Sequence, residues 1–247
     1  MLTTAVILAA GLGRRLGQRT EDRPKAMLDV GGESLLERLL RALKMTSLSE
    51  VVVVTGHHAE QVQSFVESRD LGIRVRTLFN PRYAVANNIV SFLVAEAEIR
   101  HGCLLFNSDI IVDPSVVAEV AAIDAGNWLV VDHDEPLGPE EMKIQLDGRG
   151  VIRRISKELP PAECAGEYIG AARFDALGAA ACLRAAAALV EGGGTNLYYE
   201  HAIDASAAQL QASPLPTRGR LWTEIDDLAD YDRALQIVRM WGRDTPS

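Results

Sequence analysis

The stretch that decides the fold of this 247-residue chain is Ala5-Val6-Ile7-Leu8-Ala9-Ala10-Gly11-Leu12-Gly13-Arg14-Arg15-Leu16. Its apolar first half predicts a buried strand. The small residues and two glycines that follow let the backbone turn sharply and approach a ligand closely. Successive N–H groups in such a turn suit phosphate oxygens, and Arg14, Arg15 and Lys25 add positive charge beside it. The segment therefore predicts a binding site for a nucleoside triphosphate.

Strand and helix patterns alternate through the first half of the chain. Strand patterns cover residues 4–9, 51–55, 73–79 and 102–106, and helical patterns cover residues 34–43, 61–68, 85–99 and 114–123. This alternation predicts a Rossmann-like three-layer α/β sandwich with a mostly parallel central sheet. Ligands on such sheets bind beyond the carboxyl ends of the strands. The glycine turn and the segment Asn107-Ser108-Asp109 follow the first and fourth strands, so we expect them on the same rim.

The second half of the chain has a different pattern. It predicts a hairpin over 143–156, a strand over 168–174 and helices over 176–190, 198–210 and 227–240, with a proline-containing loop at 213–216. The chain contains no linker long enough to separate two independent domains. We therefore expect one domain over 1–247, with a nucleotide-binding half (1–125) and a smaller acceptor-binding lobe (126–247).

Composition narrows the class of protein. The net charge is 25 − 34 = −9, which disfavours a nucleic-acid partner. No apolar run reaches the ~18–20 residues of a membrane span, and no basic segment precedes the first apolar run as in a signal peptide. Cys103, Cys164 and Cys182 are odd in number and form no C-x-x-C pair, as expected of reduced thiols in the cytoplasm. The pattern does not determine the oligomeric state.

The order of these motifs resembles the nucleotidyltransferase superfamily that makes nucleotide-activated sugars and alcohols. The resemblance rests on L-A-A-G-L-G-R-R-L over 8–16, P-K-A-M-L over 24–28, Asn107-Ser108-Asp109 and Glu224-Ile225-Asp226. It implies that the nucleotide is bound by Leu8, Ala9, Ala10, Gly11 and Gly13. It also implies that Arg15 and Lys25 stabilise the phosphates during catalysis, and that Asp109 and Asp226 hold Mg²⁺.

Other interpretations of these residues remain open. The glycines could form a structural turn or a dinucleotide fingerprint, although Gly17 falls too late to be the third glycine of that motif. Asp109 could be a turn residue and Asp226 a helix cap. Glu224 is more often a solvated carboxylate than a group that supports the metal ligands. Mg²⁺ prefers oxygen ligands, and Asp109 lies at a predicted strand end, but the resemblance alone places Asp226 beside it.

Within the superfamily, the middle of the chain resembles the phosphocholine and 2-aminoethylphosphonate cytidylyltransferase group. The matching segments are F-N-P-R-Y over 79–83 and N-N-I-V-S over 87–91. Asn88 and Ser108 are expected at the nucleotide; Ser108 stands where sugar enzymes more often have glycine. Lys157 is expected to hold the acceptor phosphate, with Tyr198 and Glu200 near the acceptor. As alternatives, Asn88 could start a helix, Lys157 could be solvated, and Tyr198 could pack in the core.

The resulting prediction is a Mg²⁺-dependent cytidylyltransferase. Its partners would be CTP and a small phosphorylated or phosphonate amino alcohol, phosphocholine or 2-aminoethylphosphonate, with release of pyrophosphate. The low aromatic content of 5% leaves little material for an aromatic cage and so favours a primary amine over choline. The alternatives are a sugar-1-phosphate nucleotidyltransferase, transfer of a nucleotide to molybdopterin, and a non-catalytic nucleotide-binding regulatory protein.

Overall fold

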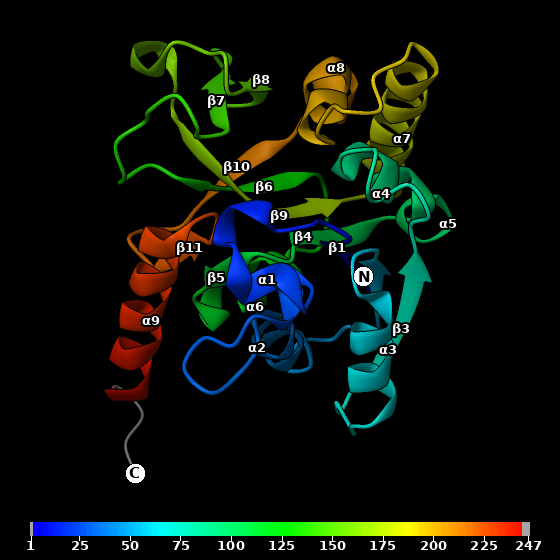
Figure 1. The fold of residues 1–247 in the computed structure, drawn as a ribbon. Helices are drawn as coiled ribbons and strands as arrows, with labels where there is room; N and C mark the ends of the chain where they lie inside the picture. The colour runs from blue at the N-terminus through cyan, green and yellow to red at the C-terminus, as the bar shows by residue number, and fades with distance from the viewer. Residues whose placement is uncertain (1, 244–247) are drawn as a thin grey trace.

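A mixed β-sheet forms the centre of the computed structural model, which describes residues 2–243 and gives the backbone alone for Arg14 and Arg243 (Figure 1). The strands lie in the order β10-β6-β9-β4-β1-β2-β3, and the hairpin β7–β8 attaches to β9. The strands are β1 Thr4–Ala9, β2 Glu50–Thr55, β3 Arg74–Phe79, β4 Cys103–Asn107, β6 Trp128–Asp132, β7 Lys143–Leu146, β8 Ile152–Ser156, β9 Gly166–Phe174 and β10 Ser213–Pro216. Apart from β7–β8, only β9 pairs antiparallel with its neighbours along this order. The predicted α/β class with a mostly parallel sheet is confirmed.

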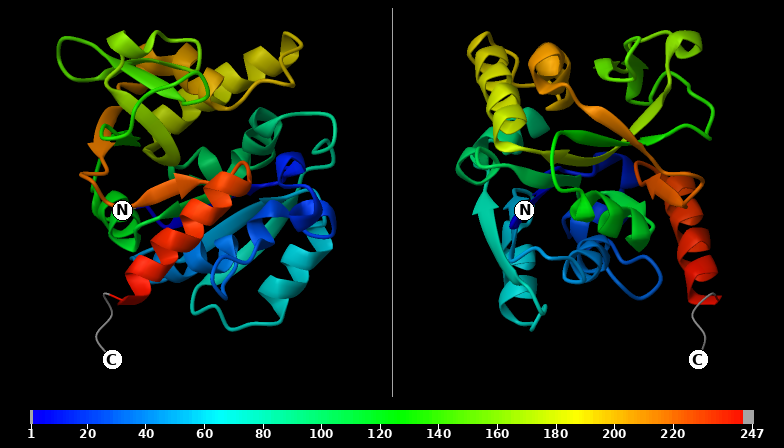
Figure 2. Two further views of the ribbon diagram at one scale, coloured as in Figure 1. Left: turned by 60° about the vertical axis from the view of Figure 1, so that its left-hand side comes forward. Right: turned by 180° about the vertical axis from the view of Figure 1, so that it is seen from behind.

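Helices cover both faces of this sheet (Figure 2). They are α1 Gln18–Glu21, α2 Leu35–Leu43, α3 Ala59–Glu67, α4 Asn88–Val94, α5 Glu96–Ile99, α6 Pro114–Ala122, α7 Ala176–Glu191, α8 Glu200–Leu210 and α9 Leu228–Arg243. Two helices begin with a side-chain cap: the side chain of Ser34 accepts from the N–H of Glu37, and that of Asp113 accepts from the N–H of Ser115. Within the described residues, no helix has the length and apolar character required to cross a membrane.

Alternate side chains of β1 enter two different cores. Val6 and Leu8 pack in a core shared with α4, α5, α7 and α8. Ala5 and Ile7 pack in a second core shared with α2, α3 and α6. Both faces of the strand are therefore buried, which explains its uninterrupted apolar run and holds its carboxyl end rigidly beside the loops that follow.

Two predicted elements are wrong in detail. The single helix expected over 85–99 begins only at Asn88 and is interrupted at Ala95, because Val85 and Ala86 are held in a turn by the carbonyl of Arg82 and the N–H of Asn87 bonds to Thr195. The loop expected over 213–216 is β10, which pairs with β6 at the edge of the sheet. Proline is tolerated on an edge strand because its missing N–H need not face a partner.

A second, two-stranded sheet lies beside the carboxyl end of β4. It pairs β5 (Ile110–Val112) antiparallel with β11 (Trp222–Glu224), and the N–H of Ile225 donates to the carbonyl of Asp109 at 2.9 Å. The sequence analysis predicts neither strand. Helix α9 then leaves β11 and packs on a third apolar cluster that includes Leu16, Leu28 and Ile225. This small sheet joins the end of the chain to the rim of the main sheet.

Candidate active site

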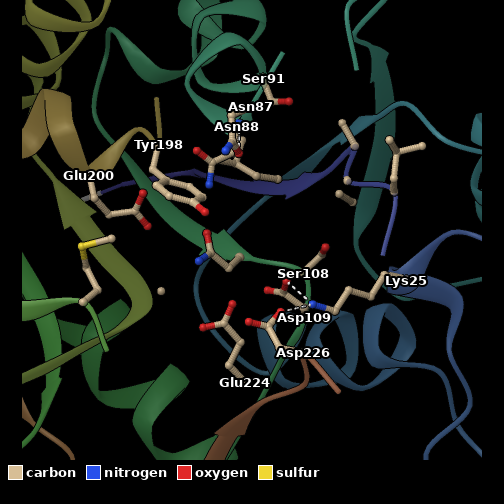
Figure 3. Close-up of a pocket in the computed structure, with 18 of the residues that line it drawn as sticks. Lys25, Asn87, Asn88, Ser91, Ser108, Asp109, Tyr198, Glu200, Glu224 and Asp226 are labelled. Atoms are coloured by element: carbon tan, nitrogen blue, oxygen red, sulfur yellow. Dashed lines mark hydrogen bonds and ion pairs between the residues drawn. The ribbon is translucent and has the colours of Figure 1, made fainter. Parts of the chain in front are cut away.

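A cavity of about 570 Å³ opens at the carboxyl ends of β1 and β4 (Figure 3). Segments from both halves of the chain line it. Of the predicted site residues, it is lined by Leu8, Ala9, Ala10, Gly11, Arg15, Lys25, Asn88, Ser108, Asp109, Lys157, Tyr198, Glu200 and Asp226. The structure therefore gathers residues up to about two hundred positions apart around one space, which is the size of a typical ligand site (roughly 300–1,000 Å³).

Gly13 is the one predicted site residue that does not line the cavity. Its φ of +61° is a conformation that favours glycine, and a Cβ atom there would lie 3.2–3.3 Å from the side chains of Thr20 and Lys25. Its carbonyl accepts a hydrogen bond of 2.8 Å from the hydroxyl of Thr20. Gly13 thus shapes the turn rather than contacting the cavity. The side chain of Arg14 lies outside the described part of the structure.

Lys25 lies at the centre of the charged end of the cavity (Figure 3). Its Nζ donates to Asp109 at 2.8 Å and to Asp226 at 2.9 Å, and Arg15 donates to the other oxygen of Asp226 at 2.8 Å. Burial by itself would lower the pKa of Lys25, but the two carboxylates raise it above its ordinary value. Burial would likewise raise the pKa of Asp226, yet Lys25 and Arg15 hold it below its ordinary value. Lys25 and Asp226 are therefore both charged at neutral pH.

A third carboxylate, Glu224, completes an acidic cluster. One carboxylate oxygen from each of Asp109, Glu224 and Asp226 lies within 4.8 Å of the others. Burial, together with the negative charges of Asp109 and Asp226, raises the pKa of Glu224 well above its ordinary value. The sequence analysis assigns Glu224 no place in the site. The spacing Glu-x-Asp could have found it, because residues i and i+2 of an extended strand face the same side.

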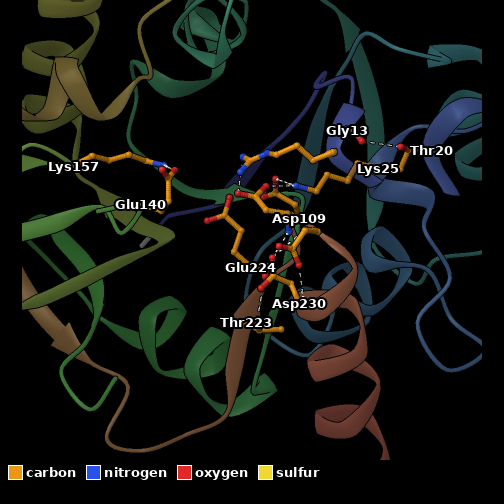
Figure 4. A network of polar contacts seen from close by, with 12 residues as sticks. Gly13, Thr20, Lys25, Asp109, Glu140, Lys157, Thr223, Glu224 and Asp230 are labelled. Atoms are coloured by element: carbon orange, nitrogen blue, oxygen red, sulfur yellow. Dashed lines mark hydrogen bonds and ion pairs between the residues drawn. The ribbon is translucent and has the colours of Figure 1, made fainter. Parts of the chain in front are cut away.

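The small β5–β11 sheet positions this cluster. Asp109 precedes β5, Glu224 ends β11 and Asp226 follows two residues later, so one ladder aligns the acids from two distant segments. At the start of α9, the carboxylate of Asp230 accepts from the backbone N–H of Asp226 at 2.8 Å (Figure 4). The backbone that carries the acids is therefore held from two sides.

The opposite end of the cavity is built from the second half of the chain. Lys157 lies 3.5 Å from Glu140 (Figure 4). Its Nζ also lies 5.6 Å from the centre of the Tyr198 ring. Glu167 also lines this end; burial, with repulsion from Glu141 and Asp132, raises its pKa to about 7. Lys157 and Tyr198 therefore lie together at this end of the cavity, and their contact with an acceptor stays a prediction.

Tyr199 and Asn88 make structural contacts at this end of the cavity. Tyr199 is completely buried, and its hydroxyl lies 2.8 Å from that of Tyr168, so it packs in the core. Tyr198, for which core packing is the alternative interpretation, is instead 36% exposed and lines the cavity. Asn88 lines the cavity, but its side-chain oxygen accepts from the N–H of Tyr199 at 2.8 Å. That oxygen ties α4 to α8, and the role of Asn88 at the nucleotide stays a prediction.

Glu200 is buried at the start of α8 and lines the cavity, with 5% of its surface exposed. Its Oε2 has no hydrogen-bond partner. Burial raises its pKa to about 7, although its own backbone N–H and the hydroxyl of Tyr199 act in the opposite direction. A buried carboxyl group without an ion pair is costly to ionise. We therefore infer that Glu200 lowers the stability of the protein and serves a function in the cavity.

Replacing Glu200 with glutamine is therefore expected to stabilise the substrate-free protein at pH 8. Because the folded-state pKa is about 7 and the ordinary value 4.5, the free energy of unfolding falls as the pH rises between these values. Glutamine does not titrate, so the gain should be absent near pH 4.5 and reach roughly 1–3 kcal/mol above pH 7. Urea unfolding of both proteins at pH 5 and pH 8 measures it.

Glu191→Gln provides the matched control, since Glu191 is exposed at the end of α7 and outside the cavity lining. It should not show the pH-dependent gain. Equal effects of the two substitutions at pH 8 would contradict the inferred burial cost at Glu200.

The sequence of the chain is similar to those of several known proteins. A family profile described as a MobA-like NTP transferase domain matches residues 5–140. The chain is 30% identical to the CMP-5'-(3-aminopropyl)phosphonate synthase of Streptomyces rubellomurinus over 58% of its own length, and the match spans 23% of that relative. It is 25% identical to the choline-phosphate cytidylyltransferase of Streptococcus pneumoniae, covering 95% of this chain and 98% of that one.

Solved structures share the fold. The CTP:phosphocholine cytidylyltransferase of Streptococcus pneumoniae superposes with a TM-score of 0.81 at 22% identity, over 96% of this chain and 100% of that chain. The mostly parallel sheet and its helical layers therefore recur in a protein whose sequence is largely different.

Proposed function

The chain belongs to the MobA-like NTP transferase family, and on that premise we propose that it is a nucleotidyltransferase that moves CMP from CTP to a small phosphorylated or phosphonate acceptor. Pyrophosphate is the second product. Two relatives named for cytidylyl or CMP chemistry support the choice of nucleotide. Their names also support an acceptor that carries a phosphate or a phosphonate group.

The observation that carries this proposal is the meeting of Arg15 and Lys25 with Asp109 and Asp226 in one cavity. Cations beside a glycine turn suit the phosphates of a nucleotide, and clustered carboxylates suit a divalent ion that binds those phosphates. A protein that merely packed these residues as a structural salt bridge would not need them to line a cavity of nucleotide size.

The acidic cluster fits Mg²⁺. The donor set of Asp109, Glu224 and Asp226 consists of carboxylate oxygens alone, and Mg²⁺ is usually bound through one or two carboxylates together with substrate phosphates. When bound, the ion would neutralise part of the charge on the triphosphate. Asp109 and Asp226 are the proposed ligands. Glu224 is proposed as a third ligand, because its carboxylate lies in the same cluster.

The residues of this chain would act mainly by positioning and charge. The backbone of Ala9–Gly11 faces the cavity and would hold the phosphates through its N–H groups. Lys25 would leave the carboxylates for the phosphates when CTP and the ion arrive, and would then stabilise the charge that grows on the leaving pyrophosphate. An acceptor oxygen attacks the α-phosphorus; its bond to phosphorus forms, and the bond to the pyrophosphate oxygen breaks with its electron pair.

The proposal is tested by pyrophosphate release with CTP, UTP, dTTP, ATP and GTP in turn. Each nucleotide is combined with 2-aminoethylphosphonate, phosphoethanolamine, phosphocholine and glucose 1-phosphate, in the presence of Mg²⁺. We expect release with CTP and an acceptor from the first three. A preference for another nucleotide with glucose 1-phosphate would replace the proposal with a sugar-1-phosphate nucleotidyltransferase.

A further inference from the structure

Two residues that line the cavity contain buried hydrogen-bond acceptors that lack donors. Among the described residues, Glu200 Oε2 and Asn107 Oδ1 are buried side-chain atoms without a partner, and both residues line the cavity. Buried polar atoms are normally paired. A buried acceptor without a partner in a residue that lines a cavity therefore indicates a ligand that supplies N–H or O–H donors.

The fold holds Glu200 in this position from several directions. Helix α8 begins at Glu200, directly after Tyr199, which is stacked on Phe92 at 5.8 Å and hydrogen-bonded through its hydroxyl to Tyr168. The N–H of Tyr199 donates to Asn88 on α4. Figure 3 shows the carboxylate of Glu200 directed into the cavity beside the ring of Tyr198. The carboxylate is thus fixed in place before any ligand binds.

Negatively charged residues outnumber positively charged ones around Glu200. Among the described residues that line this end of the cavity, Glu140, Glu167 and Glu200 outnumber the one cation, Lys157, which already lies 3.5 Å from Glu140. The nearby Lys143 lies outside the lining and donates to the carbonyls of Gly138 and Glu141. Burial raises the pKa values of both Glu167 and Glu200 to about 7. A ligand with a positive charge would reverse this cost, because an opposite charge favours the ionised carboxylate.

The type of cation follows from the lining of the site. A quaternary ammonium has no N–H and is bound by several aromatic faces. Here the cavity-lining aromatic residue beside Glu200 with an accessible ring is Tyr198, since Tyr168 is buried and its hydroxyl is paired with Tyr199. A single ring does not enclose a trimethylated nitrogen, whereas a carboxylate pairs well with a nitrogen that donates.

We propose that the acceptor carries a primary ammonium group, which donates a hydrogen bond to Glu200 beside Tyr198. This inference rests on the proposed function and specifies its acceptor: an ω-amino phosphonate or amino-alcohol phosphate rather than a choline ester. Lys157 and the charged end of the cavity then face the phosphorus end of the same molecule.

The test uses CTP with four acceptors in which methyl groups replace the N–H bonds one at a time. They are phosphoethanolamine, its N-methyl and N,N-dimethyl derivatives, and phosphocholine. We expect kcat/KM to fall along the series, with phosphocholine about 10- to 100-fold below phosphoethanolamine, the value of a hydrogen bond to a charged group. Phosphocholine turnover equal to or faster than that of phosphoethanolamine would overturn the inference and leave the proposed function intact. If none of the four acceptors gave pyrophosphate release with CTP, the proposed function itself would be refuted.

A variant series adds a second readout. Glu200→Gln should raise KM for phosphoethanolamine by about 10- to 100-fold and change that for phosphocholine little, so the discrimination between them is lost. Glu191→Gln, outside the cavity, should retain it. Because Glu200→Gln is expected to stabilise the free protein, unfolding would not account for the loss. Undiminished discrimination in Glu200→Gln would overturn the inference.

Discussion

The substitution Asp109→Asn is expected to lower the kcat of pyrophosphate release by about a thousandfold, since a bound metal ion contributes several kcal/mol to catalysis. Asp109 shares the acidic cluster with Glu224 and Asp226, so the substitution removes one negative charge from the proposed ion site. Asparagine has nearly the same shape, and the backbone carbonyl of residue 109 can still accept from Ile225. The loss should therefore concern the ion and its phosphates rather than the fold.

Steady-state pyrophosphate release over a range of Mg²⁺ concentrations measures this effect. The variant should need more Mg²⁺ to reach its residual activity, and its thermal unfolding should stay close to that of the wild type. Asp113→Asn is the matched control, because Asp113 lies four residues later, outside the cavity lining, and asparagine caps a helix as well as aspartate does. A kcat for Asp109→Asn near that of this control would exclude Asp109 from the ion site.

Methionine in place of Lys25 is expected to lower kcat/KM by about a hundred- to a thousandfold, the usual effect of removing one preorganised charge partner of a transition state. The side chain of Lys25 is 11% exposed, and its Nζ forms ion pairs with the carboxylates of Asp109 and Asp226. Methionine keeps the length of the side chain and removes the charge, so the substitution isolates the electrostatic contribution.

The same variant should bind Mg²⁺ more tightly when no nucleotide is present. In the substrate-free protein, Lys25 lies 2.8 Å from Asp109 and 2.9 Å from Asp226, so its charge competes with the ion for these carboxylates. Loss of that charge leaves the acids uncompensated, and Mg²⁺ would then compensate them. Thermal unfolding with and without Mg²⁺ should show a larger stabilisation for Lys25→Met than for the wild type.

Lys44→Met is the control for both measurements, because Lys44 is exposed at the end of α2 and outside the cavity lining. It should change neither turnover nor the Mg²⁺ response. If Lys25→Met lost activity but bound Mg²⁺ as weakly as the wild type, the lysine would act on the phosphates without competing for the ion site. Retained activity would remove Lys25 from the proposed mechanism.

Local patterns in the sequence predict much of this fold. The boundaries of β1 and the capped start of α2 at Ser34 agree with the structure. The alternation of strands and helices predicts that the glycine turn and Asp109 meet at one rim, and both line the cavity. Each of these features depends on residues within a few positions of one another, through apolar periodicity, side-chain capping and turn chemistry.

Other parts of the site depend on contacts between distant segments. Lys25 and Asp226 are 201 residues apart, and the β5–β11 ladder, which no local pattern indicates, brings the acids together. The burial of Glu200 likewise depends on Tyr199 and Asn88, 111 residues apart.

The sequence by itself therefore determined the α/β class and the glycine turn, and it predicted thirteen of the residues that line the cavity. The tertiary structure alone decided that Glu224 joins Asp109 and Asp226, and that Glu200 is buried without a counter-charge. The physical reason is that periodicity and capping act over one or two turns of chain, whereas burial, and the pKa shifts that burial causes, exist only after distant segments have packed together.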